Sequence, residues 1–563
     1  MSDGRDAAQP AAAGSVYWQP ARHELARILS WQDREAASRT YGCFDRTYWG
    51  WKFTDFPAPR YQEAVFTLAH LFTTPLADNG LYQEPRVAQW IQAGLSFWQR
   101  LQRRDGSFDE AYPFEHSLAA TAFTGFYVGE AFLRTRDVLP DAASAAASFA
   151  RAGNWLCRND ERHGVLSNHL AAAAAALYVI FRITGEARFE QRCWRFVQQI
   201  YDHQSREGWY EEYGGADPGY QTLCTFYLAR LWQYTGDATL RDSLTRSLAF
   251  LKHCVHPNGT VGGEYGSRNT EFFFPAGCEM LAAAVTDAAQ IARFMRAWVA
   301  ERRMAGVWTM DAQNALPMLN NYLFATDYAA SGAGCGASEL PCEAVGEWWF
   351  PDAGLLIKST ASFFAVVGLS KGGVVKIYDK AQRTLARSDC GYVARLSGET
   401  VASTQTLVRR STWTRAPGAC TVEADFVPLL RRLLTTPLFL GFRAFSTTVG
   451  RTQRIGYWLK NRLVRSLMRA PAAVPLRLTR HVQLDTDTVT VTDEIVAVDR
   501  LVVRECRRSE KLASVHMGSS RYFQWQELDA PLEAAPDCAA DLMAHGRARR
   551  VWTWTGGALR RER

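Results

Sequence analysis

Apolar residues recur at helical spacing through the first 330 residues, and the pattern repeats about every fifty residues. Segments 182–214 and 233–266 share one layout. In each, a helical pattern ends at Thr-Gly-acid, a second helical pattern follows, and a glycine-bearing turn leads to Glu-Tyr-Gly. The first part of the chain is therefore predicted to be a helical repeat.

Two kinds of helix alternate in this repeat. Six amphipathic segments are predicted to form an outer layer, at 21–40, 86–103, 141–157, 187–204, 238–255 and 288–303. Six more apolar, alanine-rich segments are predicted to form an inner layer, at 60–73, 115–134, 168–184, 219–235, 271–286 and 311–328. The run "NHLAAAAAALYVIF" is apolar on all sides, which is typical of a helix enclosed by others. Strict alternation of the two kinds predicts an (α/α)6 toroid over residues 21–330.

Glycine-marked turns lead from the outer helices into the inner ones, at Gly106, Gly164, Gly208, Gly259 and Gly306. Glycine just past a helical run suits the left-handed conformation that ends a helix. Because every such turn connects an outer helix to an inner one, all of them are predicted to open at the same end of the ring. Their polar residues should then converge on one funnel, into which the inner-helix N-termini would attract anions.

After the helical repeat the pattern changes to short runs of alternating, β-branched residues broken by Gly, Asp and Pro. We predict an antiparallel β-sandwich over 348–563, joined to the toroid by the Gly-rich linker 331–347, with a disordered lead at 1–20. The fold class expected is α+β multidomain, with the toroid first and the sandwich second.

Composition adds only broad limits. The chain has 563 residues, 47% of them hydrophobic, with a net charge of +7, as expected of a folded protein with a mild preference for anionic partners. The N-terminus lacks a basic region followed by an apolar core, and no apolar run is long enough to span a bilayer, so a cytoplasmic location with reduced cysteines is expected.

Three local motifs accompany this layout: the pair Asn168–His169, the tyrosine-bearing loop 207–220, and "FPDAG" at 350–354, where the β region opens. In layout and in these motifs the chain resembles the heparinase II/III-like polysaccharide lyases and related alginate lyases. Such lyases typically place an Asn and a His on one toroid loop and a Tyr on the next. Asn168, His169 and either Tyr213 or Tyr220 stand in that order.

The resemblance has one departure. Many relatives carry a histidine-rich stretch early in the β domain, which supplies a catalytic histidine or a zinc site. Here there is no histidine between His256 and His481. The chain therefore resembles a divergent branch, for which we expect neither a metal nor another cofactor.

The funnel residues suit β-elimination at a uronate, which requires a group that neutralises the carboxylate, a base for the C5 proton and an acid for the leaving O4. Asn168 and Arg268 could hold the carboxylate. His169 or Tyr220 could be the base and Tyr213 the acid, and a nearby guanidinium would lower a tyrosine pKa. Each also has a structural interpretation, since Asn168 is a good helix cap and these tyrosines could simply pack.

Further residues near these turns are candidates for binding an acidic polysaccharide or oligosaccharide. They are Glu212, Asn269, Glu271, Glu264, His116, Glu115 and Trp209. Loop carboxylates and aromatic residues of this kind are more often solvated, capping or packed in a core.

Three other functions fit the same scaffold. An inverting glycoside hydrolase would use two of the loop acids, taken from Asp109, Glu110, Glu115, Glu211, Glu212, Asp217, Glu264 and Glu271. A uronosyl C5-epimerase would use nearly the same residues as a lyase, returning a proton to the opposite face of the sugar. A non-catalytic glycan-binding factor in polysaccharide production would need no acid–base pair.

Residues 451–469 interrupt the β pattern with six Lys or Arg and no acid, and their apolar residues share one helical face. Such a segment could contact an anionic membrane surface or an acidic polysaccharide. Alternatively, it could dock on the sandwich with its charges solvated. No nucleic-acid recognition motif accompanies it, so no nucleic-acid partner is expected.

Overall fold

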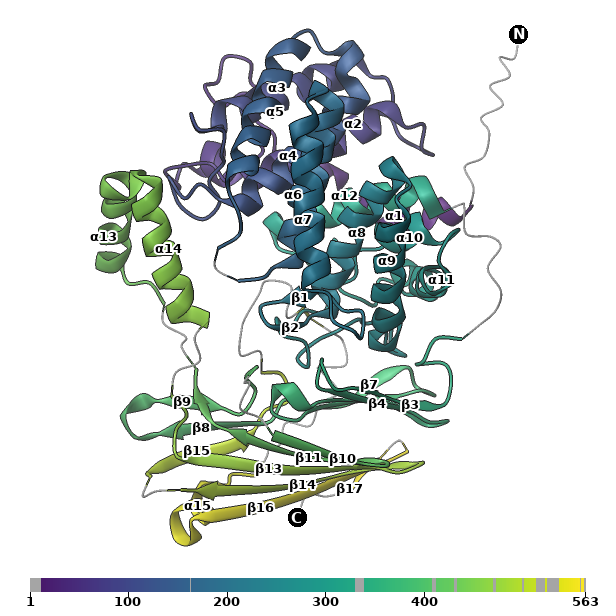
Figure 1. Cartoon of the computed structure of the whole chain (residues 1–563), viewed down its shortest axis with the longest axis vertical. Helices are drawn as coiled ribbons and strands as arrows, with labels where there is room; N and C mark the ends of the chain where they lie inside the picture. Colours follow the sequence, from purple (N-terminus) through teal and green to yellow (C-terminus); the bar gives the residue numbers. More distant parts are fainter. Residues whose placement is uncertain are drawn as a thin grey trace.

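The computed structural model describes residues 12–560, apart from 163, 330–338, 408–411, 430–432, 469–471, 499–500, 513–521, 524–535 and 557. Residues 1–11 of the expected lead, 331–338 of the expected linker and parts of the expected β region lie outside the described residues. Figure 1 shows the helical part of the chain stacked on a β-rich part, with a helical hairpin at the side.

The helical part is the predicted toroid. Its outer helices are α1 (Ala12–Leu29), α3 (Pro85–Leu101), α5 (Ala142–Arg158), α7 (Ala187–Asp202), α9 (Ala238–Leu251) and α11 (Thr286–Ala300). Its inner helices are α2 (Ala64–Thr73), α4 (Leu118–Thr135), α6 (Ser167–Thr184), α8 (Pro218–Thr235), α10 (Ala276–Leu281) and α12 (Ala312–Tyr328). Each inner helix contacts the next, and α12 contacts α2, so the inner ring closes.

Two of the glycine-marked turns make the same contact two repeats apart. Gly106 and Gly208 both have φ of +100°. A Cβ at Gly106 would lie 2.1 Å from the carbonyl oxygen of Arg151 on α5, and one at Gly208 would lie 2.1 Å from that of Arg246 on α9. Only glycine combines this backbone conformation with so close an approach. The turns thus fix each repeat against the outer helix of the next.

Two predicted helices differ from the observed ones. α1 begins at Ala12, inside the expected lead, and ends at Leu29 rather than at 40. Tyr17 and Trp18 explain the early start, because both are buried and the Tyr17 hydroxyl donates to Glu279 over 2.6 Å. The inner segment predicted at 271–286 is helical only over Ala276–Leu281, because Pro275 keeps the residues before it extended.

The β-rich part is an antiparallel sandwich, as predicted, and it begins two residues earlier than expected. One sheet contains β3 (Gly346–Phe350), β4 (Leu355–Ser359), β5 (Phe363–Gly368), β6 (Val374–Asp379) and β7 (Thr384–Asp389). A second contains β12 (Val427–Pro428), β9 (Val401–Ser403), β8 (Tyr392–Leu396) and β15 (Val503–Arg508). The third contains β10 (Thr412–Ala416), β11 (Ala419–Asp425), β13 (Leu476–Leu484), β14 (Thr488–Ala497), β16 (Arg547–Thr555) and β17 (Ala558–Arg560).

The three sheets share two apolar cores. Leu356 and Val375 of the first sheet pack with Val482, Trp552 and other residues of the third. The second sheet packs on the rest of the third, together with helix α15 (Ala539–His545). The third sheet therefore forms one layer of the sandwich, and the first two form the other.

The outer face of the β3–β7 sheet closes the turn end of the toroid. Ile357, Phe364 and Tyr378 belong to the same buried cluster as the toroid core. Across this boundary the ring of Tyr378 stacks on that of His256, with centroids 4.3 Å apart. The small hairpin of β1 (Glu211–Glu212) and β2 (Gly215–Ala216) lies at this end (Figure 1). The predicted funnel thus opens towards the sandwich.

The basic segment is the second arm of a helical hairpin, α13 (Thr436–Thr447) and α14 (Gln453–Met468), which the sequence pattern did not predict as a pair. The hairpin leaves the sandwich between β12 and β13 but packs on the toroid. Gln453 donates to the side-chain oxygen of Asn159 over 3.1 Å, and the rings of Phe442 and Tyr112 are 4.9 Å apart. The expectation that this segment docks on the sandwich is therefore wrong.

Candidate functional site

Glu212 links three segments at the turn end of the toroid. Its Oε1 accepts hydrogen bonds from the backbone and side-chain amides of Asn168, at 2.9 and 2.8 Å. Its Oε2 accepts one from the Arg268 guanidinium at 3.1 Å. All three side chains are buried. The first residues of α6, the β1–β2 hairpin and the loop before α10 are therefore joined through one carboxylate.

A second carboxylate holds the loop that carries Arg268. Asp217 caps α8 by accepting from the backbone of Tyr220 at 3.1 Å. It also accepts from the backbone of Arg268 at 2.9 Å and from the Thr270 hydroxyl. Because its oxygens are occupied by backbone and hydroxyl donors, Asp217 has a structural role here. Asn269, in the same loop, is fully buried in a left-handed conformation (φ +60°), which indicates a role in the loop's shape.

Arg268 lies against two of the predicted tyrosines. Its guanidinium carbon is 3.6 Å from the ring centroid of Tyr220 and 5.2 Å from that of Tyr213. Burial raises the pKa of Tyr220 above its ordinary value of 10.0, although Arg268 opposes this. Burial likewise raises the pKa of Glu212, against the lowering effect of Arg268. The expectation of a lowered tyrosine pKa is therefore wrong for Tyr220, because desolvation outweighs the cation.

His169 stands beside this group with one ring nitrogen occupied. Its Nδ1 lies 2.9 Å from Oε2 of Glu161, and the ring meets the edge of Phe123 with centroids 5.5 Å apart. On the other side of Phe123, the guanidinium of Arg60 lies 4.3 Å from the ring centroid. A neutral imidazole whose Nδ1–H donates to a carboxylate presents a lone pair at Nε2. His169 is thus oriented as a candidate base.

The structure therefore brings together the five predicted catalytic candidates: Asn168, His169, Tyr213, Tyr220 and Arg268. Two neighbours were missed. Arg60 begins the first predicted inner helix, so the expectation that inner-helix N-termini face the funnel could have indicated it. Glu161 carried no signal, because its contact with His169 depends on the path of an irregular loop.

Glu264 and Glu271, predicted to bind substrate, lie instead at the boundary between the two domains. Both carboxylates pair with Lys376 on β6, the one from Glu271 at 2.7 Å. The Lys376 side chain is only 1% exposed. Burial raises the pKa of Glu271, while Lys376 opposes it. These acids join the toroid to the sandwich.

Trp209 also serves this boundary. Its ring is part of the toroid core, and its Nε1 donates to Glu207 at 3.0 Å. Glu207 in turn accepts from the backbone amides of Asp352 and Ala353, at 2.7 and 2.9 Å. The predicted substrate-binding role of Trp209 is not supported by these contacts.

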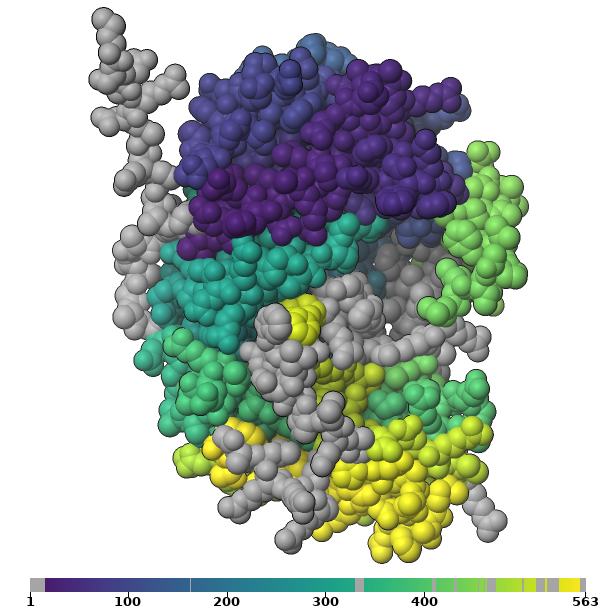
Figure 2. Space-filling view, turned by 180° about the vertical axis from the view of Figure 1, so that it is seen from behind, coloured from purple at the N-terminus to yellow at the C-terminus, as the bar shows by residue number. Residues whose placement is uncertain are grey.

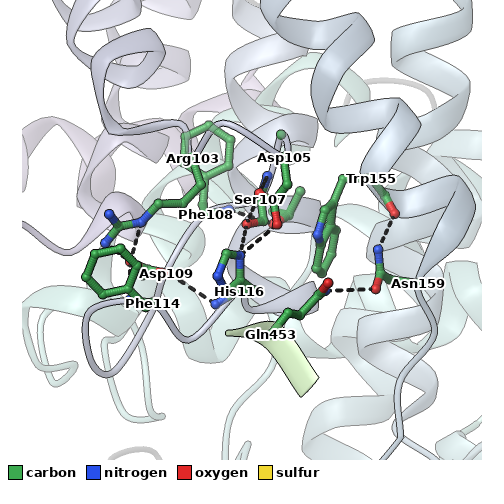
Figure 3. A network of polar contacts seen from close by, with 12 residues as sticks. Arg103, Asp105, Ser107, Phe108, Asp109, Phe114, His116, Trp155, Asn159 and Gln453 are labelled. Atoms are coloured by element: carbon green, nitrogen blue, oxygen red, sulfur yellow. Dashed lines mark hydrogen bonds and ion pairs between the residues drawn. The ribbon is translucent and has the colours of Figure 1, made fainter. Parts of the chain in front are cut away.

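His116 belongs to a separate network of polar contacts (Figure 3), and Glu115 precedes it in the chain. His116 Nδ1 lies 2.8 Å from Asp105 and 2.7 Å from the Ser107 hydroxyl. Glu115 accepts from the backbone of Ala111 at 2.6 Å. His116 has φ of +52°, a conformation that non-glycine residues seldom adopt and that these contacts hold in place. These contacts of Glu115 and His116 are made within segment 105–116.

The remaining loop acids are held by arginine or histidine side chains. Asp109 accepts from Arg103 at 2.8 Å, Glu110 from Arg60 at 3.2 Å, and Glu211 lies 3.0 Å from His203. An inverting hydrolase requires one free carboxylic acid and one carboxylate facing a common water. Contacts of this kind disfavour that assignment.

A cavity of about 960 Å³ lies between the toroid and the hairpin. Its wall includes four arginines, Arg104, Arg151, Arg158 and Arg162. Within the described part of the chain, none of the four is paired with a carboxylate. Trp155 also lines it; this residue is buried, and its Nε1 has no hydrogen-bond partner among the described residues. Figure 3 shows Trp155 beside Asn159 and Gln453 at this place.

The cavity and the catalytic candidates are joined by one short stretch of chain. Arg158 and Arg162 face the cavity, while Glu161 and His169 belong to the candidate centre.

Among the described residues, no group of three or more His, Cys, Asp or Glu is placed to hold a metal ion. In the same part of the chain, none of the helices has the length and apolar character needed to cross a bilayer.

No family model and no curated protein matches the sequence. Among solved structures, a chondroitin AC lyase from Streptomyces coelicolor A3, in complex with chondroitin sulphate, is similar over 90% of this chain and 69% of that chain, with 12% identity and a TM-score of 0.54. The two proteins share a fold. A heparan sulfate lyase, HepC from Pedobacter heparinus, gives a TM-score of 0.40 at 10% identity, over 88% of this chain and 71% of that one.

The fold shared with the chondroitin AC lyase agrees with the architecture described above. A helical toroid followed by a β-sandwich is what the sequence predicted, and the match extends over both parts. An unsaturated glucuronyl hydrolase specific for heparin matches 49% of this chain and 87% of its own, with 14% identity and a TM-score of 0.33.

Proposed function

We propose that this protein is a polysaccharide lyase that cleaves a uronate-containing polymer by β-elimination. The observation that carries the proposal is the joined group of Asn168, Glu212 and Arg268 beside His169 and Tyr220. The group provides an amide and a guanidinium that can bind a carboxylate. It also provides an imidazole whose lone pair can accept a proton and a phenol that can donate one. The chondroitin AC lyase that shares the fold was solved with an acidic polysaccharide, which supports the substrate class.

The roles follow from the protonation states. Arg268 and Asn168 bind the uronate carboxylate, so that negative charge developing there as C5 loses its proton is stabilised. His169 Nε2 takes the C5 proton. The electron pair forms the C4–C5 double bond, and the bond from C4 to O4 breaks. Tyr220, whose pKa burial raises, is protonated at neutral pH and donates its proton to O4.

The arginine-lined cavity supports a polymer rather than a small substrate. Four guanidinium groups with no carboxylate partner among the described residues are suited to carboxylate or sulfate groups further along a chain. Trp155 offers a buried N–H donor beside them. Arg162 of the cavity wall directly follows Glu161, which holds His169, and we infer that a polymer bound at the centre extends towards this cavity.

The test is turnover of uronate-containing polymers by the wild type and by Tyr220→Phe. The wild type is expected to produce the ultraviolet absorbance of a 4,5-unsaturated sugar, and the variant to lose about 10²–10⁴-fold in kcat/KM because the general acid is removed. Arg158→Ala/Arg162→Ala is the matched comparison. It should raise KM for long polymers several-fold with kcat nearly unchanged.

Three outcomes would contradict the lyase. New reducing ends without that absorbance would indicate a hydrolase. Solvent deuterium entering C5 without cleavage would indicate a C5-epimerase, whose proton abstraction needs the same groups. Folded protein with none of these signals over a broad panel of acidic glycans would leave only a glycan-binding role.

A further inference from the structure

The beginning of α13 exposes large apolar residues to solvent. Leu433 and Leu434, just before the helix, are 91% and 65% exposed, and Leu438 and Leu440 are 59% and 61% exposed. Phe439 between them is 41% exposed. Isolated exposed leucines are ordinary, but five exposed large apolar residues within eight consecutive positions are rare on a protein that contacts only water. We call these five residues the apolar tip.

Two more exposed aromatic residues lie on the neighbouring segment of the toroid. Trp51 and Phe53 are 67% and 86% exposed. The same segment touches α13, because Arg443 pairs with Asp55 at 3.1 Å and lies 5.4 Å from the ring centroid of Phe56. The aromatic pair therefore extends the apolar tip over a second element. Figure 2 shows the hairpin at the edge of the molecule, beside the N-terminal part of the toroid.

The orientation of the tip is fixed by contacts on the other side of the hairpin. Phe442 packs on Tyr112, and Arg451 lies 4.6 Å from the ring centroid of Phe114. Further along, Gln453 bonds Asn159. These contacts occupy the toroid-facing side, so the apolar tip cannot turn inwards to bury itself without breaking them.

The hairpin's own sequence carries charge of one sign, and Asp55 of the toroid neutralises Arg443. Residues 426–484 contain no Asp or Glu, and segment 429–469 contains nine Lys or Arg. Arg451 and Arg462 are exposed. Trp458 on α14 is 57% exposed as well. An apolar tip flanked by cations and exposed tryptophans matches the interface of an anionic bilayer, where apolar side chains enter the acyl boundary and cations meet the headgroups.

A second copy of this chain fits the surface less well. Pairing two such hairpins would bring together two segments that each carry six Lys or Arg and no acid over 436–468, which opposes association. A bilayer containing anionic lipid supplies both an apolar phase and the opposite charge.

We propose that the α13–α14 hairpin docks the protein peripherally on an anionic lipid surface, with Leu438, Phe439 and Leu440 inserted and Trp51 and Phe53 at the boundary. Insertion removes apolar side chains from water, and the cations add a salt-dependent attraction. The proposal does not depend on the reaction assigned to the toroid, since none of its residues belongs to the candidate centre.

The test is co-sedimentation of the full chain with sucrose-loaded vesicles, either of phosphatidylcholine alone or with about a quarter phosphatidylglycerol. The wild type is expected to bind the anionic vesicles at least about tenfold more tightly, and less tightly as salt rises. Leu438→Ser/Leu440→Ser should reduce that binding by about tenfold or more, because the inserted side chains are lost. Arg451→Gln/Arg462→Gln should reduce the preference for anionic vesicles.

The control variant is Val496→Ser/Val498→Ser, which changes two exposed apolar residues on the sandwich. It should bind vesicles as the wild type does. Equal binding by the Leu438→Ser/Leu440→Ser variant, or no vesicle binding by the wild type at low salt, would overturn the proposal. So would a concentration-dependent dimer that this variant abolishes, since the tip would then contact a second copy.

Discussion

Two turns of the toroid carry the same Glu-Tyr-Gly tripeptide one repeat apart, and the structure uses them differently. In the first, Glu212 pairs with Arg268, and Tyr213 is partly exposed beside the guanidinium. In the second, Glu264 pairs with Lys376 of the sandwich, and Tyr265 is buried with its hydroxyl 2.8 Å from His256. The first turn builds the candidate centre, and the second fastens the two domains.

The difference comes from what each turn faces. Both tripeptides follow an outer helix and precede an inner one, so the repeat places them alike. The second turn lies under the β3–β7 sheet, where Lys376 supplies the cation, whereas the first receives its cation from the toroid's own loop. The repeat thus determines where each tripeptide lies, and the neighbouring element determines which cation its glutamate contacts. The following predictions set the two turns against each other.

The largest effect is expected at the second turn, which carries Glu264. Lys376→Met removes the cation shared by Glu264 and Glu271 and leaves two buried carboxylates without it, which should lower the free energy of unfolding by about 3–5 kcal/mol. The measurement is denaturant unfolding at pH 7. Lys358→Met is the control, because the Lys358 side chain, on β4 of the same sheet, is 20% exposed, has a long ion pair of 3.8 Å and donates one hydrogen bond, to the carbonyl oxygen of Leu484. It should cost about 1 kcal/mol.

The same variant has a defined pH dependence. Burial already raises the pKa of Glu271 in the wild type, and loss of Lys376 raises it further. A carboxyl whose folded pKa is raised favours the folded state below its unfolded pKa of 4.5 and loses that contribution as pH rises. The deficit of Lys376→Met should therefore shrink towards pH 4.5. A deficit independent of pH would contradict the role assigned to these acids.

Next in size is the catalytic difference between the two glutamates. Glu212→Gln weakens the contact that positions Arg268 and should reduce kcat/KM by about 10²-fold, since small displacements of a binding group have effects of this size. Glu264→Gln should leave turnover unchanged, because Lys376 keeps Glu271 as its partner. Initial rates on the same polymer, with unfolding midpoints measured in parallel, check both. Equal losses in the two variants would remove the distinction between the turns.

The pH profile concerns the phenol beside the first turn. In the proposed reaction Tyr220 acts as the acid, so its protonated form would be required, and activity should fall as pH rises through its pKa. Burial places that pKa above 10.0. Above the pKa of Tyr220 we expect kcat to fall about tenfold per pH unit. This corresponds to an increase of about 1.4 kcal/mol per unit in the activation free energy. Circular dichroism must show folded protein over the range. A decline centred well below pH 10 would contradict the assignment.

The smallest effect is expected at Tyr265. Tyr265→Phe removes the hydroxyl that bonds buried His256 and should lower the free energy of unfolding by about 1 kcal/mol with turnover unchanged. Tyr322→Phe is the control, because that buried hydroxyl has no hydrogen-bond partner among the described residues. It should be neutral or slightly stabilising. A fall in turnover for Tyr265→Phe would place the second turn in the active centre as well.

Much of the fold could be predicted from the sequence, because period and pattern are local properties. The alternation of amphipathic and alanine-rich segments predicted ten of the twelve toroid helices closely. Asn168 and Tyr220 could be singled out because they begin inner helices. The early start of α1 could not be predicted, since it depends on Tyr17 meeting Glu279 from the far end of the toroid sequence.

The site was predicted less completely, for related reasons. Glu264 and Glu271 were chosen by residue type, but their partner Lys376 lies about a hundred residues away in another domain. The pKa of Tyr220 was expected to fall because Arg268 was expected nearby, yet the depth of burial decides its direction. Burial and long-range partners are properties of packing, which a single sequence does not display.

The contacts of Gly106 and Gly208 have a consequence for how such a chain can vary in length. In each turn the glycine packs directly against a backbone carbonyl oxygen of the following outer helix. Inserting or deleting a residue there would therefore shift one unit of the ring against the next. At the opposite connections, where an inner helix leads to the next outer one, Gly185 and Gly236 have no such close contact with the described residues. Tolerance to insertions should therefore differ between the two ends of the toroid. It should be low at the end that faces the sandwich and high at the opposite end.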